Sequence, residues 1–421
     1  MSRRPKHRND RITALYADPR GEIFDAPNVC AAARIGSSLV RLQPSDLIPL
    51  PDAADLMFLP DHPAVGFAPD GQLITLEGNA VSAILPAGFT RSHLPASDLN
   101  HRSDKPLPLF GYAAVALYRD QLHVAAINTD ENFKWNPDQY NSHDLRRRIK
   151  RVKKELPDNR LVDHLAHCSL EWHCLTAQNL FYHRWEAGLP TSPTCNARCL
   201  GCISLQEAEC CPSPQSRITF HPTVEEITDI AVYHLRDAPD AIISFGQGCE
   251  GEPSLAADRI AQSIINVREQ TPNGMININS NAGFTVGLKK IIDAGLDSIR
   301  VSIISARPDS YDAYYRSNYS LDDVKQSIRY ALDRNVYVSL NLLYLPGFND
   351  RLDELNAWID FLTELPVDMI QLRNLNIDPD YFFGIMPKSN EKYVGTKQFL
   401  STLENKFPHL KIGSFSHYNK E

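Results

Sequence analysis

The sequence predicts an α/β protein in which a β-rich domain and a helical linker precede a partial (β/α)6 barrel of the TIM type. From about residue 188, short apolar strands alternate with amphipathic helices, a pattern typical of βα units around a parallel sheet. Upstream, residues 113–118 and 122–127 are two β-rich runs around the short turn 119–121, which predicts a hairpin. We therefore expect a loose arm at 1–35, a β-rich accessory domain at 36–140, a helical linker at 141–187, the barrel at 188–375 and a C-terminal extension at 376–421.

The barrel elements are recognised by the periodicity of the helices between the strands. Thr223 and Glu226 form a capping box that begins the first helix. One later helix places Ala256, Ile260 and Ile264 on a single apolar face. The candidate strands are 189–194, 241–246, 275–280, 298–304, 336–343 and 368–373.

The predicted strands alternate apolar and polar residues, whereas strands buried on both faces of a parallel sheet usually read as continuous apolar runs. Ile299, Val301 and Ile303, for example, lie opposite Arg300 and Ser302. If the apolar faces pack on the outer helices, the polar faces line the interior, which a closed eight-stranded barrel fills with branched apolar side chains. Because buried polar groups need partners, we expect a ligand or water in this interior. Inward-facing Arg300 and Arg373 would suit an anionic group, or pair with another bound molecule or with each other.

The composition limits the classes of partner. The 421-residue chain has a net charge of −8, which gives no reason to expect nucleic acid or membrane as a partner of the whole chain. The basic N-terminus lacks the apolar segment of a secretory signal, and no apolar run is long enough to span a bilayer, so we expect a cytoplasmic protein. The basic run 146–154 has no interleaved aromatic residues, and we interpret it as a solvated helix face rather than a phosphate-binding surface.

The cysteines carry the strongest chemical signal. There are nine, and eight of them lie between Cys168 and Cys249, which indicates metal binding or reactive thiols rather than a disulfide framework. Cys195, Cys199 and Cys202 have the spacing C-x3-C-x2-C, so three thiolates can close around one [4Fe–4S] cluster. Such a cluster normally has four protein thiolates, and three leave one iron open to bind another molecule. Structural zinc is the alternative, although zinc sites usually match such cysteines with a second pair or with histidines.

A C-x3-C-x2-C motif at the start of a βα series resembles the radical S-adenosylmethionine (SAM) superfamily. At the end of the second strand, the segment 248–253 (Gly-Cys-Glu-Gly-Glu-Pro) resembles the Gly-Gly-Glu-Pro element with which that superfamily holds the SAM amino group, with Glu250 in place of the first glycine. The resemblance covers residues 188–375 and implies that Gly251, Glu252 and Pro253 bind SAM. Softer similarities at later strand ends imply further SAM contacts by Asn279, Ser302, Arg316 and Asn341.

These residues also have interpretations that do not involve SAM. Glu252 would be stabilised at the N-terminus of the helix that Pro253 opens. Asn279 would serve as a turn residue, and Arg316 as one half of a surface ion pair. Ser302 and Asn341 would be small polar fillers.

The resemblance implies that a reduced cluster cleaves SAM to methionine and a 5′-deoxyadenosyl radical, which abstracts hydrogen from a substrate. We expect a polar substrate, either a peptide side chain or a small molecule, and an electron donor such as flavodoxin or ferredoxin. Two other hypotheses stay open. One is a non-catalytic iron–sulfur or zinc module that binds nucleic acid through residues 146–154, and the other is an activase that installs a glycyl radical on another protein.

The remaining cysteines allow two interpretations. An auxiliary cluster could be held by Cys168, Cys174, Cys210 and Cys211. Alternatively, the first two lie on a helical pattern and suit small buried hydrophobic positions. The nearby His167 and His173 are interpreted as packing or surface residues rather than as ligands.

Overall fold

The computed structural model describes residues 10–101, 103, 105–130, 133–205, 213 and 215–418. The chain divides into two compact units. We call one the β-rich unit; it consists of Met1–Glu131, Tyr344–Leu355 and Asn374–Thr402. The other, the barrel unit, consists of Asn132–Leu343, Asn356–Arg373 and Leu403–Glu421. Among the helices that the structure describes, none is long and apolar enough to cross a membrane.

The β-rich unit is built on a ten-stranded sheet with antiparallel pairings. The predicted hairpin is confirmed, because β9 and β10 pair antiparallel with Leu117 opposite Leu122. The strands are β1 Thr13–Ala17, β2 Ile23–Ile35, β3 Ser38–Arg41, β4 Leu47–Pro49, β5 Asp55–Phe67, β6 Leu73–Ile84, β7 Phe89–Arg91, β8 Leu94–Pro95, β9 Tyr112–Tyr118 and β10 Gln121–Asn128.

The expected loose arm at 1–35 is wrong for the part of it that the structure describes. β1 and β2 pair antiparallel, with Tyr16 opposite Phe24, and Ala17 and Ala33 are fully buried in the sheet. Alanine is depleted in strands, so an alanine-rich buried strand gives little β signal in a sequence. The β-rich domain therefore begins before residue 36.

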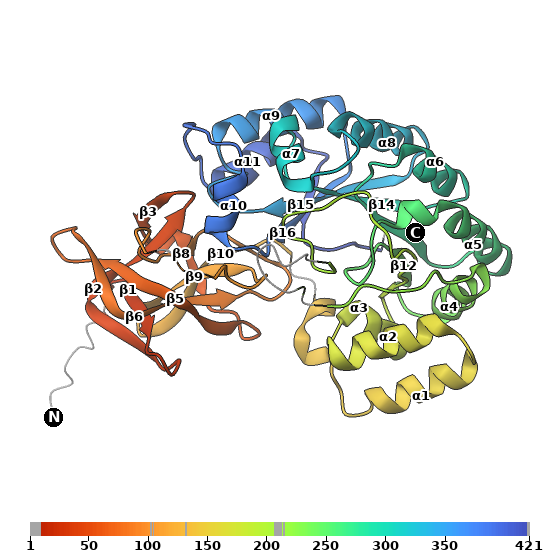
Figure 1. The fold of residues 1–421 in the computed structure, drawn as a ribbon, viewed down its shortest axis with the longest axis horizontal. Coiled ribbons are helices and arrows are strands. Elements are labelled where there is room, and N and C mark those ends of the chain that lie inside the picture. Colours follow the sequence, from red (N-terminus) through yellow and green to blue (C-terminus); the bar gives the residue numbers. More distant parts are fainter. Residues whose placement is uncertain are drawn as a thin grey trace. The chain divides into compact units, whose positions relative to one another are not determined.

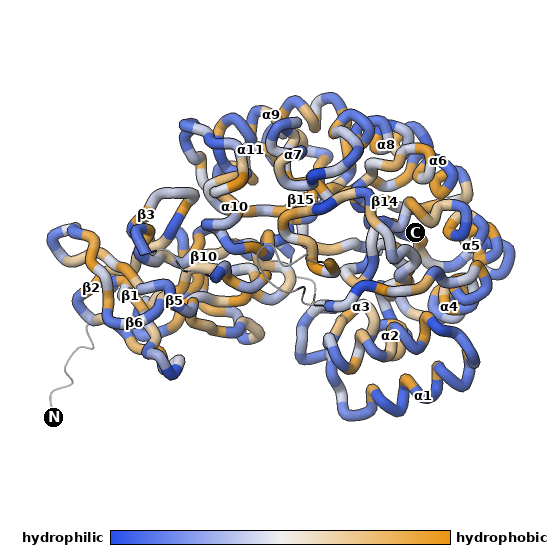
Figure 2. The backbone as a smooth tube through the Cα atoms, in the orientation of Figure 1, coloured by the Kyte–Doolittle hydropathy of each residue, from blue (hydrophilic) through white to orange (hydrophobic). Residues whose placement is uncertain are grey.

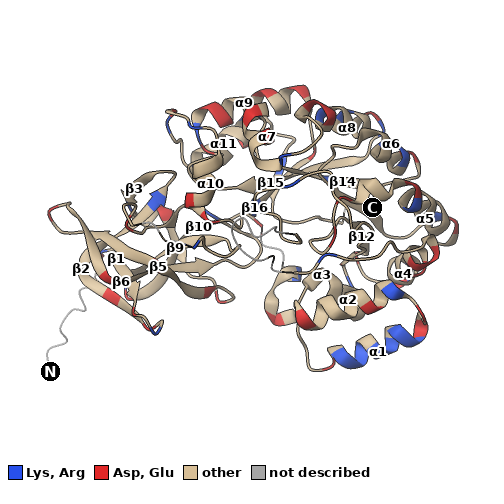
Figure 3. Cartoon of the chain, viewed as in Figure 1, with Lys and Arg blue, Asp and Glu red and all other residues tan. Residues whose placement is uncertain are grey.

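Three helices occupy the range of the expected linker. The first of them buries Leu145, Ile149 and Val152 and exposes its basic residues, which Figure 3 shows as a blue helix. Lys153 pairs with Asp163 across to the second helix at 2.6 Å. This is the arrangement of a solvated helix face. The helices are α1 Leu145–Glu155, α2 Arg160–Glu171 and α3 Leu175–Tyr182.

The barrel unit carries a seven-stranded sheet in the order β11 to β17. Successive strands pair in parallel, as β12 with β13 and β14 with β15. In Figure 1 the helices α4, α5, α6 and α8 form an arc outside the strands, and in Figure 2 the tube of each helix alternates hydrophobic and hydrophilic residues along its length. The strands are β11 Glu186–Gly188, β12 Ile242–Phe245, β13 Met275–Ser280, β14 Ser298–Ile303, β15 Tyr337–Tyr344, β16 Met369–Asn374 and β17 Lys411–Gly413. The helices from α4 onward are α4 Val224–Asp237, α5 Ala257–Gln270, α6 Thr285–Asp293, α7 Pro308–Tyr315, α8 Leu321–Asp333, α9 Leu352–Glu364, α10 Pro379–Ile385 and α11 Thr396–Lys406.

The two ends of the parallel sheet differ from the prediction. The first strand is β11, not 189–194, because Pro190 and Pro193 have no N–H to donate to a ladder. The segment 189–194 instead leads away from the strand end into the loop that holds the cysteine motif. At the other edge, β17 pairs in parallel with β16, so part of the expected C-terminal extension belongs to the sheet.

Candidate active site

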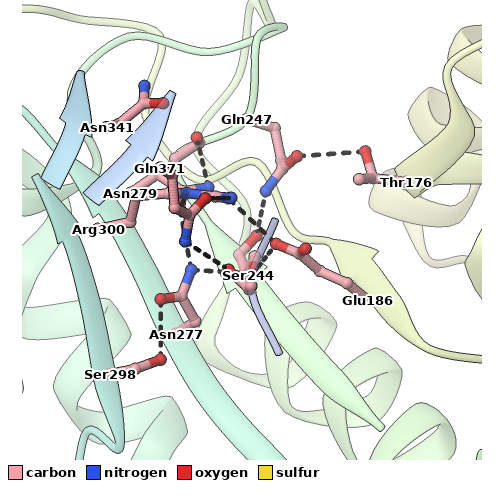
Figure 4. A network of polar contacts seen from close by, with 12 residues as sticks. Thr176, Glu186, Ser244, Gln247, Asn277, Asn279, Ser298, Arg300, Asn341 and Gln371 are labelled. Atoms are coloured by element: carbon pink, nitrogen blue, oxygen red, sulfur yellow. Dashed lines mark hydrogen bonds and ion pairs between the residues drawn. The ribbon is translucent and has the colours of Figure 1, made fainter. Parts of the chain in front are cut away.

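The polar faces of the barrel strands meet in one hydrogen-bonded network, as the alternation predicted (Figure 4). Arg300 of β14 forms an ion pair with Glu186 of β11 at 3.1 Å, and both side chains are buried. Arg300 also donates to Asn279 Oδ1 at 2.7 Å and to Gln371 Oε1 at 3.0 Å. Ser244 donates to Glu186 Oε1 at 2.6 Å. Asn277 Nδ2 closes the ring by donating to Ser244 Oγ at 3.0 Å and to Asn279 Oδ1 at 2.9 Å.

This network largely satisfies its own polar groups, which differs from the expectation that a ligand or water must supply the partners. The exception lies at the carboxyl ends of β14 and β15, where Ser302 and Asn341 face each other in the strand register. Asn341 Nδ2 donates to Ser302 Oγ at 3.4 Å, while Asn341 Oδ1 is a buried acceptor without a partner. The unused hydrogen-bonding capacity of the lumen is therefore found where a barrel enzyme binds its ligands.

The cluster loop, defined here as residues 194–202, is fixed by the last turn of α7. The N–H groups of Arg198 and Leu200 donate to the carbonyl oxygens of Tyr315 and Tyr314 at 2.9 and 3.0 Å. Helix-terminal carbonyls lack partners within their own helix, and here the loop supplies them. Cys199 lies between these two main-chain bonds, so its position is set by the backbone rather than by its own side chain.

Burial keeps the thiols of Cys195 and Cys199 protonated unless a metal group displaces their protons. Burial raises the pKa of Cys195 to about 11, with the charge of Glu252 adding to the effect. Burial also raises the pKa of Cys199 well above its usual value, and the charges of Cys195 and Cys202 raise it further. The thiols are thus close enough to interact. In the described part of the chain they do not form a group whose ligand atoms all meet within 4.8 Å, as the ligands of a single ion would.

Glu250, which takes the place of a glycine in the motif, anchors two loops. Its Oε2 accepts hydrogen bonds from the N–H groups of Thr191 and Ser192 at 2.7 and 3.0 Å. Its Oε1 accepts from the N–H groups of Gly246 and Gln247 at 2.6 and 2.8 Å. Burial raises the pKa of Glu250 to about 7, while these N–H groups oppose the rise by favouring the carboxylate. The side chain connects the segment that enters the cluster loop with the turn after β12.

Gly251 and Glu252 bring the loop after β12 against the cluster loop. The Gly251 N–H donates to Ser192 O at 2.7 Å, and the Glu252 N–H donates to Thr194 O at 2.8 Å. A Cβ atom at Gly251 would lie 2.0 Å from Thr194 O, so this close approach requires glycine.

The Glu252 carboxylate is buried and connects this loop with the end of β13. Its Oε1 accepts from the Ser254 N–H at 3.0 Å and from Ser280 Oγ at 2.6 Å, and its Oε2 accepts from the Asn281 N–H at 2.8 Å. The bond from Ser254 caps the short 3₁₀ turn Pro253–Ala256, as the interpretation without SAM anticipated. Oε1 accepts two hydrogen bonds and Oε2 accepts one, so Oε2 keeps a lone pair, and the capping role is compatible with a ligand contact.

Two other candidate SAM-binding residues, Asn279 and Arg316, form hydrogen bonds within the protein. Asn279 belongs to the lumen network, and its Nδ2 donates to Gly246 O at 3.1 Å. Arg316 ends α7 in the left-handed region, with a φ of 46°, and its Nε donates to Arg198 O of the cluster loop at 2.7 Å. Arg316 thus helps to hold the cluster loop.

The cysteines of the auxiliary-cluster hypothesis are only partly described. Cys210 and Cys211 lie outside the described residues. Cys168 is buried in α2, and Cys174 precedes α3 and contacts Thr176 Oγ1 at 3.3 Å. The hypothesis of a second cluster therefore stays a prediction.

Sequence reasoning missed the residues that hold the site together. Glu250 was noticed only as a departure from a motif, and nothing in the sequence shows that four backbone N–H groups converge on it. The link between Asn281 Nδ2 and Asn196 Oδ1, at 2.7 Å, joins residues 85 positions apart and has no local pattern. The one available signal was the acidic residue at a position where the motif has glycine.

The substitution Glu250→Gln is expected to lower the free energy of unfolding by about 3 kcal/mol. The amide NH₂ of glutamine would face backbone N–H groups, which are also donors and have no other acceptor. Urea unfolding of the metal-free full chain measures this loss. The exposed Glu404→Gln in α11 is the matched control and should stay within about 0.5 kcal/mol. Equal effects of the two variants would show that Glu250 anchors nothing.

Comparison with known proteins gives one family match, and its residues belong mostly to the barrel unit. Residues 189–362 match the family model described as the radical SAM superfamily. A search of curated proteins finds no match. Among solved structures, a methylornithine synthase (PylB) is 15% identical with a TM-score of 0.38, and the match covers 64% of this chain and 74% of that chain. A radical SAM methyltransferase from Sphaerobacter thermophilus is 14% identical with a TM-score of 0.40, over 56% of this chain and 68% of that chain.

Proposed function

Residues 189–362 are a radical SAM domain, and from this premise we propose that the enzyme removes hydrogen from a polar substrate with SAM bound at a [4Fe–4S] cluster held by Cys195, Cys199 and Cys202. When bound and reduced, the cluster supplies the electron that splits SAM into methionine and a 5′-deoxyadenosyl radical. The observation that carries the proposal is the fastening of this three-thiol loop, on one side by α7 and on the other by the loop of Gly251 and Glu252.

The residues of the chain would position SAM rather than react with it. In this proposal Gly251, Glu252 and Pro253 form one wall, because they run directly beside the cluster loop. Ser302 and Asn341 offer hydrogen-bonding capacity at the strand ends, where Asn341 Oδ1 lacks a partner.

In this proposal Asn279 and Arg316 mainly support neighbouring backbone segments rather than contact SAM. Asn279 supports the turn at Gly246, and Arg316 supports the backbone of the cluster loop at Arg198. Their substitution is therefore expected to disturb the loops that carry SAM even where the side chains do not touch it.

A polar substrate is favoured by the lining of the lumen. The side chains that face it include Arg300, Gln371 and Asn279, all held in defined orientations by one another (Figure 4). A polar lining with an acceptor still unpaired at the strand ends, Asn341 Oδ1, suits a peptide side chain or a polar small molecule better than an apolar one. A one-electron donor of the flavodoxin or ferredoxin type, and a cytoplasmic location in which it operates, complete the proposal.

The test uses the full chain, reconstituted anaerobically with iron and sulfide and then reduced with dithionite. With SAM added, we expect 5′-deoxyadenosine to form and the EPR signal of the reduced cluster to change. Reactions without SAM or without dithionite are the controls. A cluster whose EPR signal ignores SAM, with no 5′-deoxyadenosine at any level of reductant, would instead favour a non-catalytic iron–sulfur module.

Arg217 is expected to set the reduction potential of the cluster. Its Nη2 lies 3.6 Å from Cys202 Sγ, and its Nε and Nη2 donate to Ser204 Oγ at 3.1 and 3.0 Å. Hydrogen bonds to cluster sulfurs and nearby charge tune such potentials, and a cation favours the more negative reduced state. Arg217→Leu should therefore lower the midpoint potential in an EPR-monitored redox titration. Arg217→Lys, which keeps the charge, should give an intermediate value, and identical potentials for all three proteins would rule out this role.

A further inference from the structure

A second group of metal-ligating side chains lies outside the cluster loop. His164, Cys168 and Cys249 bring one nitrogen and two sulfur atoms together, all within 4.8 Å of one another. His164 and Cys168 are four residues apart on α2 and so share one face of the helix. Cys249 comes from the loop after β12, and its carbonyl oxygen accepts a hydrogen bond from the Ile218 N–H at 2.7 Å.

The geometry of this group suits one small ion. Zinc bonds to cysteine sulfur at about 2.3 Å and to histidine nitrogen at about 2.0–2.1 Å in tetrahedral sites, which places such ligand atoms about 3.6 Å apart. His164 Nε2 and Cys168 Sγ are 3.6 Å apart. Two soft thiolates and one imidazole are a donor set that zinc favours, and a hard cation such as magnesium does not.

Access and surroundings also fit an ion. Cys168 and Cys249 are buried, with 1% and 4% of their surfaces exposed, while His164 is half-buried and offers a route from solvent. The His164 ring packs edge-on against Phe220 with 6.4 Å between ring centroids, which limits its movement. A preorganised ligand set of this kind needs little rearrangement to bind a metal.

We propose that His164, Cys168 and Cys249 bind a zinc ion that fastens helix α2 to the loop carrying Glu250 and Gly251. Binding displaces the two thiol protons to solvent, and the ion bonds to both thiolates and to the neutral imidazole. Three protein ligands leave the fourth tetrahedral position to water. This site is separate from the three cluster cysteines and does not depend on the proposed function.

The experiment uses the full chain in which Cys195, Cys199 and Cys202 are all changed to alanine, so that no iron–sulfur cluster absorbs light. Co²⁺ is titrated into the metal-free protein, and zinc is then added to displace it. We expect one equivalent of Co²⁺ to give thiolate charge-transfer and tetrahedral ligand-field bands, which zinc abolishes. Absence of these bands, or bands typical of octahedral cobalt, would overturn the proposal.

Single substitutions in the same background assign the ligands. Cys168→Ser and His164→Gln should each remove most of the bound metal, and the half-buried position of His164 makes its variant the one more certain to fold, as circular dichroism would verify. Cys174→Ser is the matched control, because Cys174 does not belong to the group within 4.8 Å. Loss of metal from Cys174→Ser equal to that from Cys168→Ser would overturn the assignment. A Cys168–Cys249 disulfide would also exclude the ion. Two free thiols fewer than expected in the unreduced protein would therefore overturn the proposal as well.

Discussion

Changing Cys199 to serine is expected to reduce SAM cleavage by more than about 100-fold, because groups that merely support metal ligands already cost 10–100-fold when they are removed. A hydroxyl is a poor ligand for iron in a cluster whose other protein ligands are thiolates. The backbone of the loop should be unaffected, since the Arg198 and Leu200 N–H groups still donate to Tyr315 and Tyr314. The measurement is 5′-deoxyadenosine formed by the anaerobically reconstituted variant, together with its iron content.

Cys30→Ser is the matched control for this prediction. Cys30 is also a buried cysteine, with 3% of its surface exposed, but it lies in β2 of the β-rich unit. The control variant should bind iron and cleave SAM as the unsubstituted chain does. If Cys199→Ser retained a cluster that still responds to SAM in EPR spectra, the three-thiol assignment would be wrong.

The sequence was most informative where the chemistry is local. The cysteine spacing and the segment 248–253 lie on short stretches, and the alternation along strands such as 298–303 correctly predicted that polar faces converge. It was less informative about partners. An inward-facing Arg300 suggests an anionic ligand, yet its ion-pair partner is Glu186. That residue is 114 positions away and lies outside the predicted first strand.

The misplaced boundaries have physical causes. The segment 189–194 is predicted as a strand from its place before the cysteine motif. Its two prolines cannot donate ladder hydrogen bonds, and the strand is formed by residues 186–188 instead. The alanine-rich β2 reads as a weak strand, although it pairs with β1 and β5 and its alanines are buried. In the first case the deciding residues are the two prolines, which the sequence does show. In the second they are backbone hydrogen bonds to other strands, which residue composition does not encode.

The Gly251→Ala variant is expected to lose at least about 100-fold in SAM cleavage and about 3 kcal/mol in the free energy of unfolding. The added Cβ would lie 2.0 Å from Thr194 O and 2.5 Å from Thr194 C, and backbone atoms cannot move aside as a flexible side chain does. The cluster loop would be pushed away from the loop of Glu252, breaking the bonds from Gly251 N–H to Ser192 O and from Glu252 N–H to Thr194 O. Measurements of 5′-deoxyadenosine and of SAM affinity separate the loss of binding from the loss of cleavage.

Gly384→Ala provides the control, because a Cβ atom there meets nothing within 4 Å and the residue lies in helix α10, where alanine is the better helix former. This variant should match the unsubstituted chain in both measurements. The contrast follows from the packing of two backbones rather than from any side chain of Gly251. A Gly251→Ala protein with normal SAM affinity and normal cleavage would therefore mean that the two loops are not in contact in the working enzyme, and the fastening on which the proposed function depends would be lost.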